Sequence, residues 1–220
     1  MANVLLGVTG SVAAIRTPDL FRALKQADHE VKVVATRAAL YFFDPAHVEP
    51  SPDGRRDPDV VVLDDDEWPG MAAGRRYQRD DPVLHIELRR WAELLLIAPL
   101  DANTLAKLAC GLSDNCLTCV WRAWDPARPV VLAPAMNTLM WEHPLTRRHL
   151  VELAGFGGAS DAPGADADLD AVVHWLARAC PRLRVVPPIS KRLACGDVGV
   201  GAMADAPDIL AAVTASLARL

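Results

Sequence analysis

The stretch LLLIAPLDANTLAKLA, residues 94–109, is an unbroken apolar run followed at once by a polar turn and helix-like sequence. Comparable runs of Val, Leu and Ile occur elsewhere, and helix-like sequence follows most of them. They are residues 3–8, 30–36, 59–63, 129–135 and 183–188. Because strands that are apolar throughout are buried on both faces, the pattern predicts a parallel sheet covered by helices on both sides. The predicted fold class is therefore α/β, a doubly wound parallel sheet in three layers.

The composition of the chain limits the number of domains, the binding partners and the location that can be expected. The chain has 220 residues, of which 51% are hydrophobic, and it is predicted to form a single domain over 1–220. A net charge of −5 disfavours binding to nucleic acid or to an anionic membrane surface. No apolar stretch approaches the roughly 20 residues that span a bilayer, and the start lacks the features of a signal peptide. We expect a cytoplasmic protein whose five cysteines are thiols.

Function is expected in the loops that follow the strands. In a parallel sheet with right-handed crossovers, ligands bind outside the carboxyl ends of the strands, where these loops gather. Two other segments are predicted to be peripheral, solvated loops: residues 64–82, which mix acidic, basic, Gly and Pro residues, and residues 157–170, which are small and acidic.

The first of these loops contains Gly7, Thr9, Gly10 and Ser11 and opens a predicted helix over residues 11–26. Backbone N–H groups and the two hydroxyls of such a turn can hold a phosphate. The glycine spacing does not match the dinucleotide fingerprint, so a mononucleotide phosphate fits better than a pyrophosphate. The alternative is a tight turn with a hydroxyl N-cap.

The loop after the fourth strand, Asp101 to Thr104, also starts a helix. Its polar side chains can bind a ligand, but helix capping by itself would explain Asp101 and Asn103. The first and fourth loops therefore have to be interpreted together.

Asn137 raises the same question in the stretch LAPAMNTLMWEHP, residues 132–144. An amide at the carboxyl end of a core strand can bind a substrate, or it can cap the following helix. The methionines and the tryptophan of this stretch are interpreted as packing residues. Outside His85 the histidines show no metal-ligand spacing, so no metal site is predicted.

Three separated segments carry a resemblance to a known family: HIELRRWAELLLIAPLDANTLAKLACGLSDN (85–115), APAMNTLMWEHP (133–144) and KRLACGDVGVGAMA (191–204). They resemble the phosphopantothenoylcysteine decarboxylases, which are flavin-containing cysteine decarboxylases, and in particular the single-function eukaryotic type and the plant halotolerance proteins. The resemblance runs from about Asn3 to Met203 and fades at residues 64–82 and 157–184.

The resemblance implies a Rossmann-like or flavodoxin-like flavoprotein that forms homotrimers and binds FMN near a subunit boundary. Gly10, Ser11 and Val12 would hold the FMN phosphate. The other implied FMN contacts are Thr36, Arg37, Ala38, Asp101, Ala102, Asn103, Thr104 and Ala135. The family often has serine where this chain has Asp101, and a carboxylate beside a phosphate is repulsive, so a backbone contact is expected there.

The resemblance also implies a reaction: decarboxylation of 4'-phosphopantothenoylcysteine to 4'-phosphopantetheine in coenzyme A biosynthesis. Loss of CO₂ from a cysteine carboxyl leaves a carbanion without an electron sink, and FMN can create the sink by oxidising the C–S unit to a thioaldehyde. An enethiolate then forms, and the same flavin reduces it after reprotonation. No nicotinamide is consumed.

His85 would be the catalytic base, although a histidine at that place can also cap the following helix. Asn137 would orient the substrate carboxylate without the ion pair that would stabilise the ground state. Residues at about 189–204 would form a substrate-clamping flap, because three glycines there favour a segment that bends and closes. In this flap Cys195 would donate a proton, and the pantothenoyl contacts would be Arg192, Leu193, Ala194 and Met203.

Other functions fit parts of the pattern. Relatives in this family act as phosphatase-inhibiting regulatory subunits or decarboxylate the C-terminal cysteine of peptides. The chain retains His85, Asn137 and Cys195, which favours an enzyme, and the match over 191–203 favours the coenzyme A pathway. A nicotinamide dehydrogenase is disfavoured because the dinucleotide fingerprint is missing.

Overall fold

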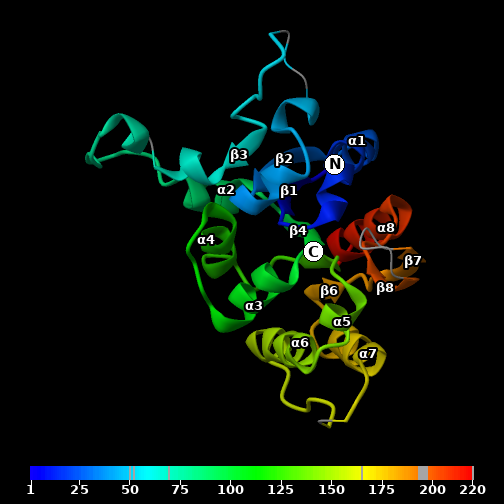
Figure 1. Cartoon of the computed structure of the whole chain (residues 1–220). Coiled ribbons are helices and arrows are strands. Elements are labelled where there is room, and N and C mark those ends of the chain that lie inside the picture. Colours follow the sequence, from blue (N-terminus) through cyan, green and yellow to red (C-terminus); the bar gives the residue numbers. More distant parts are fainter. Residues whose placement is uncertain (50, 52, 69, 165, 193–197, 220) are drawn as a thin grey trace.

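A computed structural model describes residues 1–49, 51, 53–68, 70–164, 166–192 and 198–219. Its main feature is a six-stranded parallel sheet of order β3-β2-β1-β4-β5-β6 within these residues (Figure 1). The strands are β1 (Asn3–Val8), β2 (Glu30–Ala35), β3 (Val61–Leu63), β4 (Leu94–Leu100), β5 (Val130–Pro134) and β6 (Leu183–Val185). Each lies within or close to a predicted run, and the order is that of a Rossmann fold. The predicted doubly wound α/β fold is confirmed.

Helices cover both faces of the sheet. They are α1 (Thr17–Gln26), α2 (Leu84–Trp91), α3 (Ala102–Cys110), α4 (Cys116–Arg122), α5 (Thr138–Trp141), α6 (Pro144–Phe156), α7 (Leu169–Ala179) and α8 (Ala206–Leu217). Apolar side chains of α1 and α8 pack on one face, and those of α2, α3, α4, α6 and α7 pack on the other. Figure 1 shows where these helices lie around the sheet.

The central strand β4 shows why the apolar runs are continuous. Leu95 and Ile97 belong to the core under α3 and α4, whereas Leu94 and Leu96 belong to the core under α1 and α8. All four side chains are fully buried. Since successive side chains of a strand point to opposite faces, both sets must be apolar, and each stabilises the fold by about 1.5–3 kcal/mol.

The helix predicted over residues 11–26 is divided in two. It begins as a 3-10 turn, η1 (Val12–Arg16), and becomes the α-helix α1 only at Thr17. The reason is Pro18, which has no N–H and cannot continue the hydrogen-bond ladder of a preceding α-helical turn. The prediction of one continuous helix was therefore wrong at its first turn.

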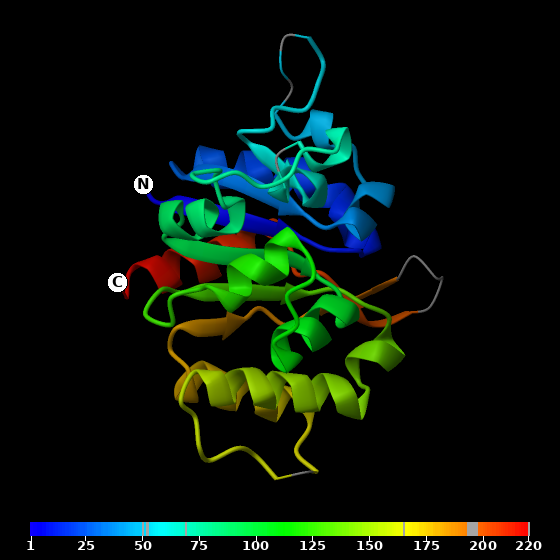
Figure 2. The same ribbon diagram turned by 90° about the vertical axis from the view of Figure 1, so that its left-hand side faces the viewer.

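The predicted flap contains a two-stranded antiparallel hairpin, β7 (Ile189–Arg192) and β8 (Val198–Ala202), separate from the main sheet. In Figure 2 it lies on the side away from the two chain ends, at the carboxyl edge of the sheet. The backbone N–H of Met136 donates to the carbonyl of Gly201 at 3.0 Å. The predicted contacts Leu193, Ala194 and Cys195 lie outside the described residues.

The glycines of β8 lie in close contact with the segment that leads into α5. A Cβ on Gly201 would stand 2.1 Å from the carbonyl oxygen of Met136, and one on Gly199 would stand 2.4 Å from Oγ1 of Thr138. A side chain at either position would push the hairpin off the start of α5. Close packing of the hairpin on this segment therefore requires both glycines.

The two segments predicted to be solvated loops differ in how exposed their side chains are. The described residues of 157–170 are exposed or half-buried, as predicted. In 64–82, however, two short 3-10 helices form, η4 (Asp64–Glu67) and η5 (Met71–Ala73), and the Glu67 side chain is only 3% exposed. The prediction was wrong for Glu67, because η4 packs against α2.

Within the described residues no helix combines the length and the apolarity needed to cross a membrane.

His29, at the turn between α1 and β2, leads to a prediction about pH. Burial, followed by the nearby positive N-terminus, lowers its pKa. In the unfolded chain the imidazole takes up a proton below about pH 6.5, while the folded protein resists protonation, so the folded state loses stability as the pH falls below that value. We expect the melting temperature of a His29→Gln variant to fall less than that of the wild type between roughly pH 7.5 and 5.5. His47→Gln, at an exposed position, is the control, and parallel wild-type and His29→Gln curves would contradict the assignment.

Candidate functional site

Three of the predicted cofactor segments meet at Gly10. A Cβ on this glycine would stand 2.7 Å from the Cβ of Ala38 and 3.2 Å from Oδ2 of Asp101. The loops after β1, β2 and β4 therefore touch here, where the strand order changes direction between β1 and β4. Only a residue without a side chain fits this junction, which explains the glycine of the first loop.

The hydroxyl of Thr9 joins the loop after β1 to the loop after β4 through two hydrogen bonds. It donates to the carbonyl of Pro99 at 2.8 Å and accepts from the backbone N–H of Asp101 at 2.7 Å, and the residue is fully buried. The hydroxyl proton of Thr9 is therefore already used in a hydrogen bond within the protein. The prediction that both hydroxyls of this loop can hold a phosphate was wrong for Thr9.

Ser11 is the N-cap of η1. Its Oγ accepts from the backbone N–H of Ala13 at 3.4 Å, so the alternative of a hydroxyl N-cap is realised. As an acceptor in this contact, the hydroxyl keeps its own proton for donation to a further group. Ser11 can therefore cap the turn and contact a ligand at the same time.

Asp101 is the N-cap of α3, and its Oδ1 accepts from the backbone N–H of Thr104 at 2.7 Å. Thr104 is buried, whereas Asn103 is exposed and is not the cap. Capping therefore explains the Asp101 side chain but not Asn103.

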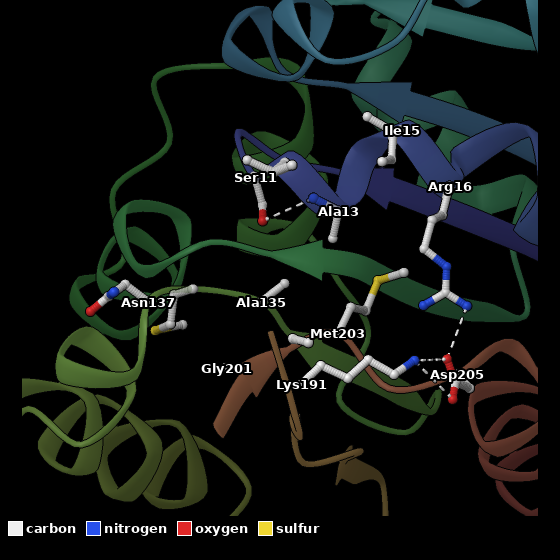
Figure 3. A pocket seen from close by; sticks show the side chains of 13 residues that line it. Ser11, Ala13, Ile15, Arg16, Ala135, Asn137, Lys191, Gly201, Met203 and Asp205 are labelled. Carbon is white, nitrogen blue, oxygen red and sulfur yellow. Dashed lines mark hydrogen bonds and ion pairs between the residues drawn. The ribbon is translucent and has the colours of Figure 1, made fainter. Parts of the chain in front are cut away.

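A cavity of about 520 Å³ opens beside these loops at the carboxyl edge of the sheet (Figure 3). Its lining comes from η1, the end of β5, the β7–β8 hairpin and the start of α8. The residues are Ser11, Val12, Ala13, Ile15, Arg16, Ala135, Met136, Asn137, Lys191, Gly201, Ala202, Met203 and Asp205. The structure thus brings together the predicted residues Ser11, Val12, Ala135, Asn137 and Met203. Thr36 to Ala38, Asp101 to Thr104 and His85 do not line this cavity.

Asn137 caps a helix, as one of the two alternatives predicted, and its position also places it in the wall of the cavity. It is the N-cap of α5, where its Oδ1 accepts from the backbone N–H of Leu139 at 2.9 Å, and it also lines the cavity.

A charged cluster that sequence reasoning missed lies at the other end of the cavity from Asn137. Figure 3 shows Arg16 and Lys191 both reaching Asp205. Lys191 Nζ lies 2.9 Å from Oδ1 of Asp205, and Arg16 Nη2 lies 3.3 Å from the same oxygen. The hydrogen bond from Lys191 holds the pKa of Asp205 below its usual range. These residues are far apart in the sequence, and no local pattern joins them.

His85 is the second residue of α2, whose N-cap is Val83, so the capping alternative is wrong for this histidine. Its Nδ1 is paired with Oε1 of Glu67, and the imidazole is 19% exposed. Glu67 was missed because the acidic run 64–67 looks like a solvated surface segment.

Cys116 and Cys119 lie on α4 near this pair. Burial, followed by the carboxylates of Glu67 and Asp64, raises the pKa of the Cys116 thiol far above its ordinary range. Such a thiol is not ionised at neutral pH and is not a nucleophile. The buried Cys116 side chain therefore serves packing. The described cysteines Cys110, Cys116, Cys119 and Cys180 are all free thiols.

A Rossmann-ordered sheet whose loops meet at the switch point beside a cavity defines a nucleotide-binding class of α/β protein. The model of the Flavoprotein family matches residues 1–218. Phosphopantothenoylcysteine decarboxylase of Mus musculus is 44% identical over 218 residues, which are 99% of this chain and 88% of the mouse protein. The enzyme of that name from Arabidopsis thaliana is 44% identical over 92% of this chain and 79% of its own length.

Two solved structures resemble the fold closely. One is a cysteine-to-serine mutant of PPC decarboxylase in complex with pantothenoylaminoethenethiol, with a TM-score of 0.74 and 42% identity over 97% of this chain and 96% of that one. The other is the FMN binding protein AtHal3, with a TM-score of 0.71 and 42% identity over 100% of this chain and 98% of that one. This chain belongs to the flavoprotein family and, within it, to the phosphopantothenoylcysteine decarboxylases.

Proposed function

We propose that this protein is an FMN-dependent decarboxylase that converts 4'-phosphopantothenoylcysteine to 4'-phosphopantetheine in coenzyme A biosynthesis. The observation that carries the proposal is the 44% identity to the mouse enzyme over almost the full length of both chains. The junction at Gly10 and the cavity beside it supply a place for a cofactor and a substrate at the carboxyl edge of the sheet.

The residues around this edge fit FMN. At Gly10 the backbone is free of a side chain, and Ser11 and Val12 lead from it into the cavity, which suits a phosphate at the start of η1. The other FMN contacts would be Thr36, Arg37 and Ala38, the backbone from Asp101 to Thr104, and Ala135. Bound FMN would supply a reversible two-electron oxidation of the cysteine C–S unit, the electron sink that decarboxylation requires.

The chain's own groups would handle the protons and the carboxylate. His85 would accept a proton from the substrate as the C–S unit is oxidised. Asn137, which lines the cavity, would orient the substrate carboxylate. A neutral amide orients the carboxylate without opposing its loss of charge. Met203, with Arg192, Leu193 and Ala194, would contact the pantothenoyl part.

Cys195 would return a proton to the product before it leaves. The complex of the related decarboxylase supports a late role for a cysteine, since that cysteine-to-serine mutant was solved with an aminoethenethiol rather than a saturated thiol. In this chain we assign the role to Cys195, within the KRLACGDVGVGAMA segment.

We further propose a homotrimer in the cytoplasm. Ile15, Leu139 and Leu145 expose more than half of their side chains, and the first of them lines the cavity. The assembly itself is proposed from the resemblance to the family, which implies a homotrimer with FMN near a subunit boundary. A particle mass three times that of the chain, measured by light scattering, is the expected result.

The experiment that tests the function starts with the purified protein. We expect a yellow protein that releases FMN on denaturation and discriminates against FAD and NAD in equilibrium titration, because the predicted site holds a single phosphate. It should release CO₂ from 4'-phosphopantothenoylcysteine but not from a peptide with a C-terminal cysteine. Equal affinity for FAD, or turnover of the peptide alone, would contradict the proposal.

A further inference from the structure

The acidic turn η4 contains a carboxylate that folding does not require. Glu67 is the only acidic residue among the described residues whose side chain is buried, at 3% exposed. Burial of a carboxylate costs stability unless it is paired and hydrogen-bonded. Its Oε1 is paired with Nδ1 of His85, and the buried thiol of Cys116 lies beside the same carboxylate. Stability by itself would favour an apolar side chain here.

Two other acids of η4, Asp64 and Asp66, hold this turn in place. Asp66 accepts from the backbone N–H of Leu63 at 2.8 Å and pairs with the guanidinium of Arg56 at 2.6 Å. Asp64 accepts from the backbone N–H of Arg37 at 3.0 Å and from that of Cys116 at 3.3 Å. One turn is thus anchored to the end of β3, to the loop after β2 and to the start of α4. The position of Glu67 is set before any ligand binds.

These contacts connect two parts of the proposed site, the segment of Arg37 and His85, and neither part lines the main cavity. Arg37 belongs to the segment assigned to FMN, and His85 is the proposed base. Through Asp64 and Glu67 the same turn contacts both. A group fixed in this way can hold the orientation of the His85 imidazole relative to the cofactor loop. Residues that contact a metal-binding histidine from behind fix its ring in the same way.

We propose that Glu67 is the positioning residue of His85, an inference that rests on the proposed role of His85 as the base. Nδ1 carries hydrogen and donates it to the Glu67 carboxylate, which leaves Nε2 unprotonated as the ring atom that accepts the substrate proton. When Nε2 takes that proton, the adjacent carboxylate stabilises the imidazolium, and the Nδ1 proton stays on the ring.

The first test reads the tautomer directly and does not depend on activity. Long-range ¹⁵N–¹H correlation spectra of the ¹⁵N-histidine-labelled holoprotein, with His85→Asn used for assignment, should show hydrogen on Nδ1 of His85 in the wild type. In Glu67→Gln the Nε2–H form should increase, because an amide can donate to Nδ1 as well as accept from it. Hydrogen on Nε2 in the neutral wild-type ring would overturn the inference.

The second test uses kinetics with a matched control. Glu67→Gln should retain FMN and lower kcat by about 10–100-fold while KM stays close to that of the wild type. Asp65→Asn removes an exposed charge from the same turn and should leave kcat unchanged. Because Glu67 acts through His85, Glu67→Gln added to His85→Asn should cause no further loss. A further loss in the double variant, or equal effects of Glu67→Gln and Asp65→Asn, would overturn the inference.

The outcomes separate this inference from the proposed function. Near-normal turnover of His85→Asn would show that His85 is not the base, and both the proposed role and the inference would then be wrong. An inactive His85→Asn together with a fully active Glu67→Gln would leave the proposed function intact and refute only the role of Glu67.

Discussion

Replacing Cys195 with serine is expected to let the protein release carbon dioxide once per active site and then stop. In the proposed mechanism the oxidative half of the reaction does not use this thiol, so decarboxylation should still occur. A free thiol has a pKa of about 8.5, whereas a serine hydroxyl is a far weaker acid and cannot replace it as a proton donor. The product would therefore remain an enethiol, and the flavin would remain reduced.

The measurement combines single-turnover CO₂ release, the flavin spectrum and the product mass. The released or bound product should be lighter than 4'-phosphopantetheine by one pair of hydrogens, and steady-state turnover should fall by about 10²–10⁴-fold. Cys110→Ser is the control, because Cys110 is an exposed thiol at the end of α3. Normal product from Cys195→Ser at a modestly changed rate would show that the thiol is not the donor.

Replacing His85 with asparagine should stop the reaction before carbon dioxide leaves. Asparagine keeps a polar side chain next to Glu67 but cannot take up a proton near neutral pH, so oxidation of the substrate would lose its base. We expect the variant to bind FMN normally and to release CO₂ about 10²–10⁴-fold more slowly, with the flavin left oxidised in the presence of substrate.

His174→Asn is the control for this variant, because His174 is an exposed histidine on α7. Stopped-flow absorbance of the flavin and CO₂ release should both be normal in the control. The two active-site variants leave opposite flavin states, oxidised for His85→Asn and reduced for Cys195→Ser. A His85→Asn variant that reduces its flavin at the wild-type rate would remove His85 from the oxidative half.

The architecture could be predicted from the sequence because its signals are local. In residues 94–109 the apolar run, the polar turn and the helix start are continuous in the chain, and burial on both faces requires that composition. The N-cap Asp101 follows its strand directly and the N-cap Asn137 follows its strand closely, so capping could be foreseen as an alternative for both. The positions of the loops at the carboxyl edge follow from parallel pairing.

Tertiary structure decided the residues whose partners are distant in the sequence. Glu67 is the buried acidic residue of the run 64–67 because η4 packs on α2. This packing places the Glu67 side chain against His85. Arg16, Lys191 and Asp205 form one cluster only after the hairpin and α8 reach η1. The sequence by itself determined the layers of this protein and the edge where its site lies, since these depend on local periodicity. Which charged groups face one another there depends on long-range packing, and that is determined only when the chain folds.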